Sequence, residues 1–150
     1  MNDAVRMADY APRSLFVYGT LRQGEPRHGL LGGADFIGTG LTPPAFHLVD
    51  VGPYAALVPG GATAVAGELY RVTLETRRAI DVALEVPILF KREQIQLADG
   101  ADADAYVLSV DQVRGRRRLA HGDWKQRFSR SISRQAGGAW AAWSRDRWKK

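Results

Sequence analysis

A strand that runs directly into a glycine turn is the feature that most constrains this chain. Residues 15–21 have the sequence Leu-Phe-Val-Tyr-Gly-Thr-Leu, so residues with strand character lead straight into a Tyr-Gly-Thr turn. Gly19 gives the backbone conformations that are closed to other residues, and it lets the amides of the turn approach a ligand closely. The segment predicts the floor of a small-molecule pocket. An ordinary strand followed by a tight turn is the alternative.

Five short motifs, in the same order along the chain, resemble the gamma-glutamylcyclotransferase-like family, which includes the gamma-glutamylamine cyclotransferases. Residues 15–21 resemble the family's signature, and residues 24–26 (Gly-Glu-Pro) resemble the loop that follows it. The other three are a Val-x-Gly-Glu-Leu-Tyr strand at 65–70, a helix-to-strand passage at 80–92 and a Gly-Asp-Trp at 122–124. Each motif alone is weak, whereas the ordered set spans roughly residues 14–125.

The predicted elements indicate an α+β fold class. Short strands are expected at 14–19, 36–41, 45–49, 54–58, 65–72, 88–97 and 105–110. One helix begins after Thr73, a plausible N-cap, and ends at Leu84 or Glu85, because Pro87 disfavours helical geometry in the residue before it. This pattern predicts a small mixed β-barrel with one main helix, and the resemblance implies the same fold.

Domain boundaries follow from the change in composition along the chain. Residues 1–13 are expected to be a flexible lead-in, and residues 14–125 form the gamma-glutamylcyclotransferase-like domain. Residues 126–150 form a basic, Trp-rich tail. Helical pieces at 111–120 and 139–148 give the fold a basic helical C-terminal extension.

The residue types present exclude several kinds of site. The chain has no cysteine, so it has no disulfide and no thiolate nucleophile or metal ligand. Its three histidines are scattered without ligand spacing, and a metal site is not predicted. No apolar run reaches the length of a signal peptide or a membrane span, which favours a cytoplasmic protein.

The net charge of +5 conceals two parts of opposite sign. Residues 1–111 contain 9 Lys and Arg against 14 Asp and Glu, whereas residues 112–150 contain 12 against 2. Basic and aromatic residues interleaved in this way can bind nucleic acid, an anionic membrane or a protein partner. A solvated tail whose tryptophans pack on the body or on a partner subunit is the alternative, and the oligomeric state stays open.

The resemblance implies a reaction that needs no cofactor. The alpha-amine of a gamma-glutamyl amine or gamma-glutamyl amino acid attacks the gamma-carbonyl, closes 5-oxoproline and expels an amine. Because the reaction is intramolecular, holding the reactive conformer can supply about 7–11 kcal/mol of the barrier reduction. The protein must also place donors near the oxyanion and move protons.

Substrate-binding residues are predicted in the turn and at three later positions: Tyr18, Gly19, Thr20, Leu21, Tyr54, Phe90 and Arg92. The turn residues line the substrate cavity by resemblance. Tyr54 and Phe90 form either cavity walls or core aromatics. Arg92 either holds a substrate carboxylate or pairs with an acid of the sheet.

The catalytic base is where the chain departs from the family pattern. The family has a Glu three residues after the Asp that matches Asp81, and this position is Leu84 here. The nearest Glu is Glu85, and one residue turns a helical side chain by about 100°. Either the helix frays and Glu85 acts as a shifted base, or the base is lost and the protein is a non-catalytic small-molecule binding or adaptor protein. Glu68 is a fallback carboxylate, and its place in a strand favours a solvated or structural role.

Overall fold

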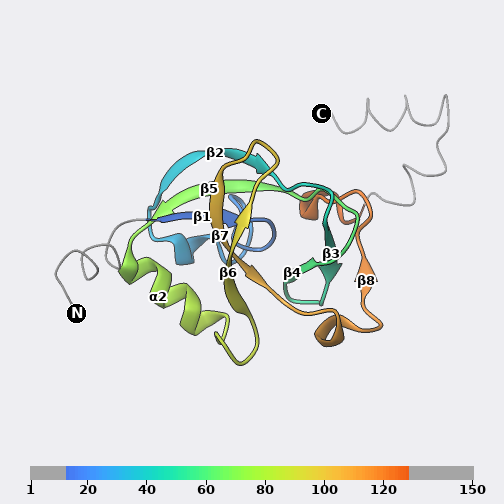
Figure 1. The fold of residues 1–150 in the computed structure, drawn as a ribbon. Helices are drawn as coiled ribbons and strands as arrows, with labels where there is room; N and C mark the ends of the chain where they lie inside the picture. Colours follow the sequence, from blue (N-terminus) through green and yellow to red (C-terminus); the bar gives the residue numbers. More distant parts are fainter. Residues whose placement is uncertain (1–12, 129–150) are drawn as a thin grey trace, which may run out of the picture.

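One large mixed sheet and one main helix make up the computed structural model, which describes residues 13–128 (Figure 1). The strands are β1 (Arg13–Val17), β2 (Asp35–Leu41), β3 (Phe46–Asp50), β4 (Ala55–Pro59), β5 (Ala66–Val72), β6 (Lys91–Gln96), β7 (Asp102–Val107) and β8 (Arg117–Arg118). The helix is α2 (Leu74–Ala83), and short 3-10 helices occur at η1 (His28–Leu31), η2 (Asp111–Val113) and η3 (Trp124–Gln126). The predicted α+β class with one main helix is confirmed.

Strand β7 is the branch point of the sheet. The strand order is β2-β5-β1-β7-β4-β3-β8, and β6 pairs antiparallel with β7 along the other edge of β7. Strands β1 and β4 both meet β7 in parallel, β1 through Leu15 and Asp104 and β4 through Leu57 and Val107. The same edge of β7 therefore pairs with β1 and, a few residues later, with β4. Strands β1 and β4 separate at this point.

The predicted closed barrel is wrong, because the two ends of the sheet do not pair. Within residues 13–128, β2 pairs only with β5, and β8 pairs only with β3. A backbone hydrogen bond of 2.8 Å from Ala98 N to Leu41 O connects the end of β2 to the turn after β6. Strand β8, at the other end of the sheet, has only two residues, so it is too short to extend the pairing as far as β2.

The helix predicted at 111–120 is also wrong. The chain forms the short η2 there and then β8, and between them Gly115 adopts a left-handed φ of 79° that a continuing helix does not allow. Residues 1–12 of the lead-in and 129–150 of the tail lie outside the described residues. The piece predicted at 139–148 and most of the segment proposed to bind a partner lie there too, whereas Arg13 is the first residue of β1.

Helix α2 brings the 80–90 segment onto the sheet. Thr73 caps its start by accepting a hydrogen bond from Thr76 N at 3.2 Å, and Leu84 is the C-cap residue. Ile80 and Leu84 are buried in one core cluster with Leu15 and Phe90. Full burial of an aliphatic side chain of this size stabilises a fold by roughly 1.5–3 kcal/mol, so this contact holds the helix against β1.

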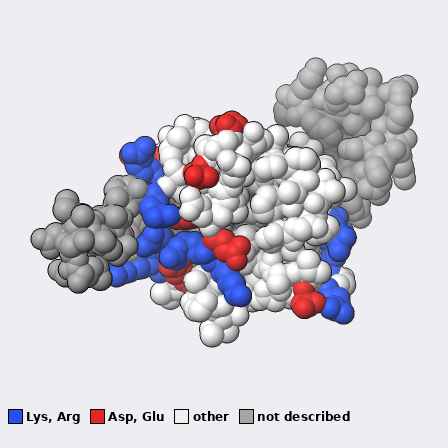
Figure 2. Space-filling model, in the orientation of Figure 1, with Lys and Arg blue, Asp and Glu red and all other residues white. Residues whose placement is uncertain are grey.

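Basic and acidic side chains are intermixed on the face that carries α2 and β6 (Figure 2). Two ion pairs contribute to this pattern, one between Arg13 and Asp104 at 2.8 Å and one between Arg92 and Asp81. No helix among residues 13–128 combines the length and the apolar character that crossing a bilayer requires.

Candidate functional site

The turn after β1 is held through its carbonyl groups. The carbonyl oxygens of residues 19–21 accept hydrogen bonds, in order, from Arg22 N at 3.0 Å, Arg27 N at 2.9 Å and His28 Nδ1 at 2.9 Å. Because a carbonyl only accepts, the His28 proton is on Nδ1. The N–H groups of the same three residues find no acceptor within 13–128, although all three residues are buried. Buried backbone donors without a protein partner are rare, so these three N–H groups make the turn the candidate binding site.

Gly19 is required by close packing. A Cβ atom added to it would lie 2.6 Å from the Cβ of Ala55, the first residue of β4. Its φ lies outside the left-handed region, so the conformational freedom expected of this glycine from the sequence is not what the fold uses. The missing side chain lets the end of β1 and the start of β4 touch.

A hollow lies at this contact between β1 and β4. It is lined by Phe16, Val17, Tyr18, Gly19, Thr20, Leu21, Tyr54, Ala55, Leu84, Phe90 and Tyr106. Its volume is about 20 Å³, which is room for one water molecule. Tyr54 is the one lining residue that is half-buried, and the others are buried. An amino-acid-sized molecule therefore enters only if the wall moves, and Tyr54 is the wall residue nearest to solvent.

The hydroxyl of Tyr18 is used inside the protein. It donates a hydrogen bond of 2.7 Å to the backbone oxygen of Tyr106, on the part of β7 where β1 and β4 separate. Burial raises the pKa of Tyr18 far above its ordinary value, so the hydroxyl stays protonated and acts as a donor. The ring of Tyr18 therefore lines the hollow, and its hydroxyl connects the end of β1 to β7 where β1 and β4 separate.

The two predicted wall aromatics meet at the hollow. The rings of Tyr54 and Phe90 pack edge to face with their centroids 5.3 Å apart, and both line the cavity. Phe90 is 1% exposed and belongs to the core as well. The guanidinium of Arg27 lies 5.2 Å from the centroid of the Tyr54 ring, so an arginine covers this wall residue.

Arg92 lies outside the lining of the hollow and pairs with an acid of helix α2. Its guanidinium binds Asp81, which also accepts a 2.7 Å hydrogen bond from the Tyr106 hydroxyl. Burial and this bond to Asp81 raise the pKa of Tyr106. These contacts among Arg92, Asp81 and Tyr106 therefore connect α2 to β6 and β7.

Leu84 faces the hollow, and Glu85 does not. Leu84 is 5% exposed and lines the cavity, whereas Glu85 is exposed and lies outside the lining. Glu85 adopts a left-handed φ of 56° immediately after the C-cap residue, which ends the helix and turns the chain away. The lining contains no carboxylate.

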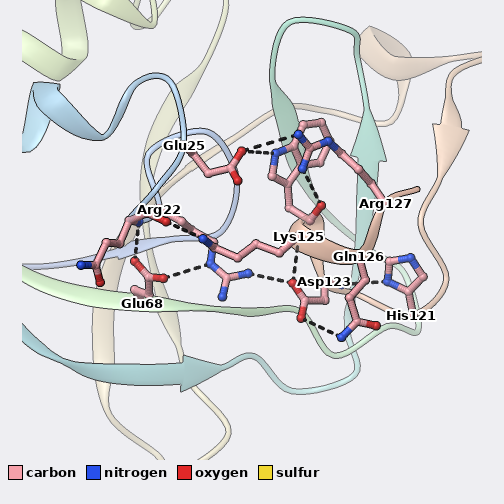
Figure 3. Close-up of polar contacts among 10 residues, drawn as sticks. Arg22, Glu25, Glu68, His121, Asp123, Lys125, Gln126 and Arg127 are labelled. Atoms are coloured by element: carbon pink, nitrogen blue, oxygen red, sulfur yellow. Dashed lines mark hydrogen bonds and ion pairs between the residues drawn. The ribbon is translucent and has the colours of Figure 1, made fainter. Parts of the chain in front are cut away.

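Glu68 anchors the turn from β5 (Figure 3). It accepts hydrogen bonds from Gln23 N at 2.9 Å, the Tyr70 hydroxyl at 2.9 Å and Arg22 Nε at 3.3 Å. Burial alone would raise its pKa, but these donors together hold the pKa of Glu68 below its ordinary value. Arg22 also pairs with Asp123 at 2.8 Å, so one guanidinium joins two carboxylates.

A second set of contacts fixes the loop after the turn (Figure 3). The indole Nε1 of Trp124 donates to Glu25 at 3.2 Å, and Arg127 lies over the Trp124 ring at 4.4 Å. The motifs at 24–26, 65–70 and 122–124 therefore meet in space. We call Arg22, Glu25, Glu68, Asp123 and Trp124 the loop clamp. Sequence analysis identified four of these residues through their motifs and missed Arg22, which has no signal of its own beyond following Leu21.

The described part of the chain contains no group of three His, Cys, Asp or Glu side chains arranged to hold a metal ion.

Comparison with known proteins identifies the group to which these motifs belong. Residues 15–126 match the family described as gamma-glutamyl cyclotransferase, AIG2-like. A candidate gamma-glutamylcyclotransferase of Vibrio cholerae is 36% identical over 114 residues, which cover 75% of this chain and 96% of that protein. The gamma-glutamylaminecyclotransferase of Mus musculus is 35% identical over 92 residues, covering 55% and 62%. A crystal structure of an AIG2-like protein from Mus musculus matches with a TM-score of 0.61 at 29% identity, over 66% of this chain and 78% of that one.

We expect Gly19→Ala to destabilise the fold by about 1–3 kcal/mol, because the new methyl group must push β4 away from β1. Gly29→Ala is the matched control, since no atom lies within 4 Å of a Cβ added there. Chemical denaturation measures both free energies of unfolding. Equal stability of the two variants would show that the close approach to Ala55 is unimportant.

Glu68→Gln should lower the free energy of unfolding at neutral pH by about 1–3 kcal/mol, because a charged acceptor of the loop clamp is lost. The folded pKa of Glu68 is depressed below 4.5, so its contribution is full above that pH and fades as the pH falls through the folded pKa. The difference between wild type and variant should therefore shrink in acid. Glu93→Gln, at an exposed position on β6, should show neither effect.

Proposed function

The chain belongs to the gamma-glutamyl cyclotransferase, AIG2-like family, and we propose that it binds a small gamma-glutamyl compound at the Tyr18–Leu21 turn without cyclising it efficiently. The observation that carries this proposal is the lining of the hollow, which includes Leu84 and contains no carboxylate. By resemblance, position 84 is where the family has its Glu, so the lining supports a site that binds the ligand but lacks the group that removes a proton.

The turn supplies the binding groups. The N–H groups of residues 19–21 lack acceptors within the described residues, and a carboxylate or carbonyl oxygen of a glutamyl group would satisfy them. Such donors would also stabilise an oxyanion at the gamma-carbonyl. The loop clamp keeps the turn fixed, so these donors are preorganised before a ligand arrives.

The missing base limits the chemistry. The alpha-amine of a glutamyl group is mostly an ammonium at neutral pH, and it must lose a proton before it attacks. A positioned general base contributes about 10²–10⁴-fold to such a step. Orientation within the site can still favour ring closure, so the proposed consequence is slow turnover with retained binding.

Glu85 can reach the hollow only if it exchanges places with Leu84. That exchange moves a buried leucine into water, which costs roughly 1.5–3 kcal/mol, and it undoes the left-handed residue that ends α2. The buried position of Leu84 and the exposed position of Glu85 therefore oppose the shifted-base hypothesis.

An active gamma-glutamylcyclotransferase is the second candidate. It is favoured by relatives that carry this name at 35–36% identity and by the unpaired amides of the turn. The two candidates share the same ligand class and differ in whether 5-oxoproline is released.

Introducing a carboxylate at position 84 should create the activity. We expect wild type to release little 5-oxoproline from gamma-glutamyl amines or gamma-glutamyl amino acids, and Leu84→Glu to release about 10²-fold more or better. Leu84→Gln is the matched control, because it places a side chain of similar size and polarity in the same buried position without a base. Chromatographic detection of 5-oxoproline measures all three proteins.

The outcome that contradicts this proposal is fast turnover by the wild-type protein. If Glu85→Gln then abolishes it, Glu85 is the base and the protein is an enzyme. This second measurement needs no change at the buried position, so it remains decisive if the variants at Leu84 do not fold.

A further inference from the structure

We propose that Arg27 selects ligands that carry a carboxylate at the end facing solvent, so that the site prefers a gamma-glutamyl amino acid to a neutral gamma-glutamyl amine. This inference rests on the proposed function, since it concerns the outer end of the same ligand. It depends on where the Arg27 guanidinium lies and on its lack of an acidic partner within the described residues.

Arg27 contacts both the turn after β1 and the wall residue Tyr54. Its backbone N–H donates to Thr20 O at 2.9 Å, which fixes its Cα beside the turn. Its guanidinium lies 5.2 Å from the ring centroid of Tyr54, the half-buried residue of the lining. A molecule that enters past Tyr54 therefore passes the guanidinium of Arg27.

The guanidinium of Arg27 forms no hydrogen bond or ion pair with any residue in 13–128. Glu25, two residues away in sequence, is engaged elsewhere, since it accepts a hydrogen bond from Trp124 and lies 3.7 Å from Arg127. Arg22, another half-buried arginine, differs in that it pairs with both Glu68 and Asp123. Arg27 is thus a half-buried cation held only by the face of an aromatic ring.

The orientation of a gamma-glutamyl ligand follows from the two ends of the site. The inner end, beside residues 19–21, offers backbone N–H donors to the glutamyl oxygens. The group attached to the gamma-carbonyl then points outward past Tyr54. A carboxylate on that group meets the planar fork of an arginine, which binds carboxylates through two parallel hydrogen bonds.

Two matched probes test the proposal by isothermal titration calorimetry on the full chain. Gamma-glutamylglycine and gamma-glutamylglycinamide differ only in that the terminal carboxylate of the first is a neutral amide in the second. We expect wild type to bind the acid about tenfold to hundredfold more tightly, the range of a hydrogen bond to a charged group. Arg27→Gln should bind both probes equally, and Arg27→Lys should keep part of the preference.

Arg78→Gln provides the control for net charge, because Arg78 is exposed on α2 and lies outside the lining of the hollow. It should retain the full preference for the acid. Thermal unfolding of Arg27→Gln establishes that the variant is folded. Equal binding of both probes by wild type, or a preference that survives in Arg27→Gln, overturns the role of Arg27 and leaves the proposed function standing. Binding of neither probe by wild type overturns the proposed function, and this inference with it.

Discussion

The site depends on one constraint in the sheet: strand β7 pairs first with β1 and then, further along the same edge, with β4. A sheet edge can pair with one strand at a time, so β1 and β4 must separate where β7 passes from one to the other. The Tyr18 hydroxyl satisfies the Tyr106 carbonyl at that point, and Gly19 lets the strands touch just beyond it. The hollow and the unpaired amides of the turn are consequences of this geometry.

A turn with unpaired buried donors needs support from outside itself. The loop clamp provides it, because Arg22 joins the carboxylate of Glu68 on β5 to that of Asp123 in the late Gly-Asp-Trp motif. Removing either acid leaves a largely buried guanidinium short of a partner, and such groups are expensive to leave unpaired. The late Gly-Asp-Trp motif is therefore part of the turn's architecture, although it lies about a hundred residues away in sequence.

Local signals in the sequence were sufficient for the strand-turn segment, for the α+β class and for the end of α2. The helix, predicted to end at Leu84 or Glu85, ends at Ala83 with Leu84 as its C-cap residue, and the motifs placed residues 15–21 correctly at the end of the first strand. Closure of the sheet could not be predicted, because it depends on strand pairing between β2 and distant segments rather than on local pattern. The role of Arg27 was missed for a similar reason, since nothing in the sequence shows that it lies over Tyr54.

Leucine at position 84 accounts for the small volume of the hollow and for the absence of a carboxylate from its lining. Leu84 packs in the same cluster as Ile80 and Phe90, where a carboxylate would lose its hydration and gain no described basic partner in the lining. A catalytic carboxylate in such a place is a destabilising feature that enzymes retain for function, and leucine removes this cost while it fills the space. Under the proposed function, the turn, the loop clamp and Arg27 serve recognition of the ligand, and leucine at position 84 serves the packing of the core rather than the chemistry.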